Sequence, residues 1–171
     1  MAALGMSRGR DLGGRLPRKV AIATLPKGWV VVLARRDAAL KAPFTAVAAL
    51  GPAVACFQEE HVMYSEARGY AGGVEAWRVV RDPEAEPEDD VAITGDPPAS
   101  LDKIYKTMRG KQDRQDDDEV DFLYEIAPRL AKTVCGFRTD AKWPAGCTFI
   151  ELDKGAGGRK PGFFQRLFGR G

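Results

Sequence analysis

The stretch that decides the fold class is residues 53–80, which read AVACFQEEHVMYSEARGYAGGVEAWRVV. Residues 53–57 and 61–65 are rich in β-branched and aromatic side chains, which is typical of strands, and the two runs are close enough to form one long strand. Residues 74–80 have the same composition and follow the glycine-rich segment 69–73. Because glycines between two such runs favour a reversal of the chain, this region predicts a β-hairpin.

Further elements are expected on both sides of this hairpin. Residues 19–25 and 28–34 predict a second hairpin across a tight Pro-Lys-Gly turn. Helical spacing or helix-favouring composition, bounded by proline or glycine, predicts three helices, and shorter apolar runs predict three more strands. The expected helices are 43–50, 100–108 and 128–135, and the expected strands are 91–94, 120–126 and 147–152. The sequence therefore predicts an α+β fold with a mostly antiparallel sheet built from hairpins and about three helices.

Charge is distributed unevenly along the chain, although the formal net charge is only +2. Residues 1–19 hold five basic and one acidic side chain, residues 20–153 hold 16 basic and 23 acidic ones, and residues 154–171 hold five basic and no acidic ones. We therefore expect a basic, flexible N-terminal segment (1–19), one acidic α+β domain (20–153), and a glycine-rich linker with a basic-aromatic tail (154–171).

Several classes of protein are disfavoured by what the sequence lacks. No apolar run approaches the roughly 18 to 20 residues that span a bilayer, and the N-terminus lacks the apolar core of a signal peptide. Three widely spaced cysteines suit reduced, buried thiols, so we expect a cytoplasmic protein. Neither zinc-ligand spacing nor a phosphate-binding glycine loop is present, and we expect no metal and no cofactor.

The single histidine offers the main argument for catalysis. On a regular strand, Glu59, His61 and Ser65 would point to the same face, which would supply a carboxylate, a base and a nucleophile. This arrangement would suit a small hydrolase or transferase centred on His61. No nucleophile-elbow motif accompanies these residues, however, and the sequence favours an exposed polar strand face and a non-enzymatic protein.

Acidic side chains concentrate in two hydrophilic segments, 82–90 and 113–121. The second segment lacks the central glycine of a calcium-binding loop, so steering towards a basic protein partner is the simpler role. Trp77 and Tyr64 would serve as aromatic anchors if exposed, although the core is the expected place for Trp77. The residues predicted to bind the partner are Glu59, Glu60, Asp89, Asp90, Asp116, Asp117 and Asp118.

The tail contains an apolar stripe at helical spacing, formed by Phe163, Phe164, Leu167 and Phe168. Such a stripe suits a partner's groove, the protein's own core, or peripheral contact with a membrane surface. Basic side chains in both tails favour non-specific contact with nucleic acid at most. The acidic centre argues against specific nucleic-acid readout.

Three stretches together resemble a small bacterial family that has no assigned activity. They are residues 59–65, then Gly73 with 77–82, then 120–126 running into 130–131 and 136–140. The resemblance covers about residues 28–140 and brings no catalytic residues. Some members of that family are of the kind found near toxin genes, so the resemblance implies an intracellular bacterial accessory protein of immunity-like function. Together these observations predict a non-enzymatic module that binds a basic partner through acidic loops.

Overall fold

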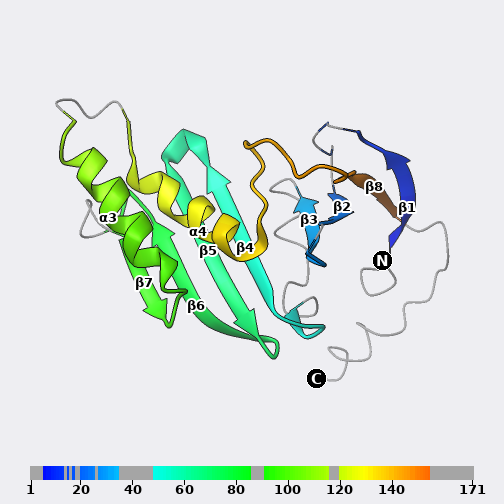
Figure 1. The fold of residues 1–171 in the computed structure, drawn as a ribbon, viewed down its shortest axis with the longest axis horizontal. Coiled ribbons are helices and arrows are strands. Elements are labelled where there is room, and N and C mark those ends of the chain that lie inside the picture. The colour runs from blue at the N-terminus through cyan, green and yellow to red at the C-terminus, as the bar shows by residue number, and fades with distance from the viewer. Residues whose placement is uncertain are drawn as a thin grey trace, which may run out of the picture.

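The structure is a computed structural model that describes residues 6–13, 15, 17, 20–25, 27–34, 48–85, 91–115 and 120–154. Two antiparallel four-stranded sheets lie side by side, and two α-helices cover one face of the larger sheet (Figure 1). The strand order is β4-β5-β6-β7 in the larger sheet and β1-β8-β2-β3 in the smaller one. The predicted α+β class and the hairpin-built antiparallel pairing are therefore confirmed, although the strands form two sheets rather than one.

The larger sheet is a meander in which each strand pairs with the next one along the chain. Its strands are β4 (Ala53–Glu59), β5 (Tyr64–Ala71), β6 (Val74–Arg81) and β7 (Val91–Gly95). The hairpin expected around residues 69–73 forms as β5 and β6. Residues 53–65 do not form one long strand, which the sequence left open, and residues 61–62 are not strand as expected, because β4 ends at Glu59 and a 3-10 turn, η2 (Glu60–Val62), follows. Met63 then takes a left-handed conformation, φ 49°, which reverses the chain into β5.

Two α-helices pack on one face of this sheet, α3 (Ser100–Gln112) and α4 (Ile126–Cys135). The described residues thus hold two α-helices rather than about three, and the helix expected over 43–50 lies mostly outside them. Gly136 ends α4 in the left-handed region, as its sequence position suggests. The shared core consists of Ala67, Trp77, Val79, Val91, Leu101, Met108, Leu123, Ile126, Ala127, Leu130 and Ala131.

Residues 120–126 do not form the expected strand. Residues 120–122 are irregular, and the 3-10 turn η3 (Leu123–Glu125) follows them and leads directly into α4. Leu123, Ile126 and Leu130 recur at a helical spacing and are all buried against the sheet. A short apolar run such as residues 120–126 is compatible with either a strand or a helix, and the packing of these three side chains against the sheet favours the helix.

The smaller sheet contains the predicted hairpin of β2 (Val20–Thr24) and β3 (Val30–Ala34). Strand β8 (Ile150–Lys154) lies three residues beyond the start expected for it and pairs with β2. Strand β1 (Met6–Asp11) pairs with β8 and was not predicted from the sequence. Three rings, Phe137, Trp143 and Phe149, pack together on the inner side of this sheet.

Candidate functional site

Three chain connections meet at one end of the larger sheet. The register pairs Glu59 with Tyr64, Ser65 with Arg81, and Arg81 with Val91. The turn between β4 and β5 and both ends of the β6–β7 connection therefore lie at this end. The connection between α3 and α4 reaches the same end, in the upper left of Figure 1, because Asp121 contacts Arg81. We call residues 59–63, 81–90 and 109–121 the acidic end.

The three segments named in the acidic end hold, in sequence, most of the acidic residues of the central region, and six of these acidic residues are among the described ones. These segments hold 14 acidic and four basic side chains, whereas the rest of residues 20–153 hold nine acidic and 12 basic ones. Glu60, Glu84 and Asp113 are exposed, and Glu59 is half-buried. The predicted partner-binding residues Asp89, Asp90, Asp116, Asp117 and Asp118 lie outside the described residues. The larger sheet thus presents carboxylates from three separate connections at one place.

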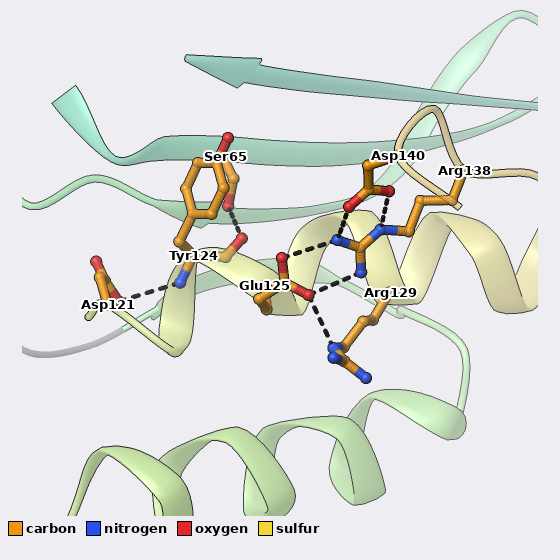
Figure 2. Close-up of polar contacts among 7 residues, drawn as sticks. All are labelled: Ser65, Asp121, Tyr124, Glu125, Arg129, Arg138 and Asp140. Carbon is orange, nitrogen blue, oxygen red and sulfur yellow. Dashed lines mark hydrogen bonds and ion pairs between the residues drawn. The ribbon is translucent and has the colours of Figure 1, made fainter. Parts of the chain in front are cut away.

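A buried polar network fixes the base of the acidic end, and Figure 2 shows the part of it around Tyr124. Nε of Arg81 lies 2.8 Å from Oδ2 of Asp121, and both side chains are largely buried. The other oxygen of Asp121 accepts the backbone N–H of Tyr124 at 3.1 Å. Ser65, which is fully buried, donates its hydroxyl hydrogen to the backbone oxygen of Tyr124 at 2.7 Å. These contacts tie the start of η3 to β5 and β6.

The candidate catalytic residues Glu59, His61 and Ser65 do not share one strand face. Glu59 ends β4, while His61 is exposed in the 3-10 turn that follows it. Ser65 faces the helices on the next strand, and the Tyr124 carbonyl already accepts its hydrogen. The predicted alternation of side chains between the two faces of a strand therefore ends at Glu60, because the chain leaves the extended conformation there.

A second polar network joins the start of α4 to the segment that follows the helix. The Nη1 and Nη2 groups of Arg138 donate hydrogen bonds to the two carboxylate oxygens of Glu125, at 2.7 and 2.8 Å (Figure 2). Arg138 also donates a hydrogen bond to Asp140 from Nε. Arg129 contacts the Glu125 carboxylate at 3.1 Å. Hydrogen bonds from Arg138 hold the pKa of Glu125 below its usual range, although burial acts in the opposite direction. Of these contacts, only the i,i+4 spacing of Glu125 and Arg129 is a sequence signal.

A third network lies on the sheet face away from the helices. Glu66 is almost fully buried there, and it accepts hydrogen bonds from Arg68, from Nε of Arg78 at 2.6 Å and from the Tyr64 hydroxyl at 3.0 Å. Burial opposes the charge of Glu66, but these donors prevail and lower its pKa. Tyr64 is half-buried, and Trp77 belongs to the core. Neither residue is a fully exposed anchor.

Within the described ranges, no three His, Cys, Asp or Glu side chains gather closely enough to hold a metal ion. A depression of about 650 Å³ lies at the opposite end of the sheet, where β7 leads into α3, and its lining includes Trp77, Asp96 and Leu101. None of the helices described is long and apolar enough to cross a membrane. The tail residues Phe163, Phe164, Leu167 and Phe168 lie outside the described part, so their predicted interactions remain predictions.

No known protein family, curated protein or solved structure matches the chain.

Proposed function

We propose that this protein is a non-enzymatic binding module whose acidic end docks onto a basic protein. The observation that carries this proposal is the convergence of three acidic connections at one end of the sheet. By composition, each connection alone is an ordinary hydrophilic segment. In sequence, the three connections together hold an excess of ten negative charges, and their described ends meet at one end of the sheet, where a single partner surface can contact them.

The physical role of such a surface is to attract and orient a partner of opposite charge. Clustered like charges raise association rates and disfavour partners that carry the same sign. The Arg81–Asp121 ion pair and the Ser65–Tyr124 hydrogen bond support this role. They hold the end of the α3–α4 connection in a fixed position against β5 and β6. A fixed base lowers the entropy lost when the surface binds.

An immunity-like role is the more specific form of the proposal. A toxin that acts on nucleic acid needs a basic active surface, and an acidic protein can cover that surface in place of the substrate. This form rests on the resemblance of residues 28–140 to a small bacterial family that has no assigned activity, some members of which are of the kind found near toxin genes, and on the charge of the acidic end. It implies a partner encoded by the same cell and a location in the cytoplasm.

The test compares two variants of equal net charge. The acidic-end variant combines Glu60→Gln, Glu84→Gln and Asp117→Asn, whereas the control combines Asp96→Asn, Asp102→Asn and Asp153→Asn. The three control residues are exposed and lie outside the acidic end. Proteins captured from the source cell by the tagged full chain are identified, and the affinity of each purified candidate is measured at two salt concentrations.

We expect one basic protein whose Kd rises at least about tenfold, or about 1.4 kcal/mol, with the acidic-end variant. The control variant should retain wild-type affinity, and added salt should weaken binding of the wild type. If both variants bind alike, or if every captured protein is acidic or neutral, the proposal is wrong. For the immunity-like form, co-expression with the wild type must abolish toxicity of the captured protein.

A further inference from the structure

Strand β3 (Val30–Ala34) is an outer strand of the smaller sheet, and one of its edges has no strand beside it among the described residues. Leu25 donates its backbone N–H to the oxygen of Trp29 at 2.7 Å, which closes the β2–β3 hairpin. Hydrogen-bonded and non-hydrogen-bonded residue pairs alternate along an antiparallel pair of strands. Counting from the Leu25–Trp29 pair, Val31 and Leu33 are therefore the β3 residues whose backbone groups hydrogen-bond to β2. The N–H and C=O groups of residues 30, 32 and 34 therefore point away from the sheet.

The side chains along this edge are apolar and partly exposed. Val30 is 54% exposed and Val32 is 38% exposed, and both lie on the outer face of the sheet. Residues 28–34 contain no charge and no proline, and the β2–β3 register has no bulge. Natural edge strands usually carry a charged residue, a proline or a bulge, because each of these blocks pairing with a strand of another chain.

The other outer strands differ from β3. Strand β1 carries Arg8 and Arg10 and has a register shift against β8. Strand β7 exposes Ile93, but acidic residues 86–90 precede it and Asp96 follows it, so antiparallel self-pairing would bring like charges together. None of the side chains of β4 is a large exposed apolar group. Strand β3 is therefore the edge best suited to pair with another strand.

We propose that β3 pairs antiparallel with β3 of a second copy of the chain, about a two-fold axis at Val32. In this register Val32 lies opposite its own counterpart, and Val30 lies opposite Ala34 of the second copy. All outward N–H and C=O groups at positions 30, 32 and 34 then find partners across the axis. The exposed valines gain apolar neighbours, and no charge lies within residues 28–34 of either copy to oppose the contact.

The size of the contact sets its strength. Two five-residue strands bury less than the roughly 1,200 Å² of total surface that a stable specific interface requires. The dimer is therefore weak and forms only at high protein concentration. Because the acidic end belongs to the other sheet, this association is independent of the function proposed above.

Sedimentation equilibrium of the full chain tests this proposal, at concentrations from about 1 µM to about 1 mM, which cover weak affinities. We expect a monomer–dimer equilibrium that Val32→Lys weakens at least about tenfold, because it sets like charges opposite each other. Val74→Lys is the matched control, since Val74 is 69% exposed in the other sheet. A chain that stays monomeric throughout, or dimerises equally well as Val32→Lys, overturns the proposal.

Cysteine cross-linking tests the register. Residue 32 of each copy should lie about 5.5 Å from its counterpart between Cα atoms, which a disulfide can bridge. Residue 30 of each copy should lie about 13 Å or more from its counterpart, which is too far. Oxidation should therefore cross-link Val32→Cys but neither Val30→Cys nor the wild type with its three native cysteines. Cross-linking of Val30→Cys as readily as Val32→Cys, or none of Val32→Cys, contradicts the two-fold at Val32.

Discussion

Replacing Gly69 by alanine tests the packing of the larger sheet most directly. Gly69 lies within β5, directly opposite Trp77 of β6, and the indole ring covers it. A methyl group at position 69 would lie 2.0 Å from Nε1 of Trp77, which no side chain tolerates without movement. The indole must leave its site in the core, so we expect Gly69→Ala to cost about 2 to 4 kcal/mol, near the upper range for overpacking.

Urea unfolding followed by circular dichroism measures this cost, and a double-mutant cycle with Trp77→Ala assigns it. Trp77→Ala alone should cost about 3 to 5 kcal/mol, because it empties a buried site. The three atoms nearest to the added methyl group all belong to the indole, so once the indole is absent the double variant should be about as stable as Trp77→Ala alone. Gly110→Ala is the control, since its methyl group has no close neighbour in α3 and should stabilise the protein by about 0.5 to 1 kcal/mol.

Two outcomes would refute this reasoning. Gly69→Ala could change the free energy of unfolding by less than about 0.5 kcal/mol, as an ordinary surface substitution does. Alternatively, the effects of Gly69→Ala and Trp77→Ala could simply add, which would show that the indole does not cover the glycine.

Three further substitutions test the polar networks and the backbone. Ser65→Ala should cost about 1 to 2 kcal/mol in urea unfolding, because the buried carbonyl of Tyr124 loses its donor; an unchanged midpoint would contradict this. The lowered pKa of Glu125 contributes stability above pH about 4.5 that is lost as the pH falls through its folded-state pKa, so Glu125→Gln should flatten the acid side of the stability profile; an identical profile would argue against the pair with Arg138. Gly95→Ala should cost at least about 2 kcal/mol, since φ is +72° and the methyl group would lie 2.1 Å from a backbone oxygen; a smaller loss by thermal unfolding would exclude that geometry.

Local signals account for the elements that the sequence predicts well. The β2–β3 hairpin follows from a β-rich run, a turn with Gly28 at φ +82°, and a second β-rich run. The end of α4 follows from Gly136, and the apolar spacing of α3 is visible in Leu101 and Met108. Each of these features depends on residues within one or two turns of each other, so a short window of sequence contains the cause.

The structure differs from the predictions where a short window fits two conformations. Residues 120–126 suit a strand by composition, yet residues 123–125 form η3 and Ile126 begins α4, and in this conformation Leu123 and Ile126 are buried in the core. Residues 53–65 suit one strand, but η2 divides them, and His61 and Ser65 are thereby placed in different surroundings. Composition alone gives no reason to prefer either outcome.

The sequence by itself determined that this protein is an α+β chain with paired strands and an acidic central region. Only the tertiary structure brought the three acidic segments to one end of a sheet, buried Ser65 against Tyr124 and set Trp77 over Gly69. The physical reason is that these relations depend on strand order and register. Register is fixed by contacts between residues far apart in the chain, which no local pattern of side chains encodes.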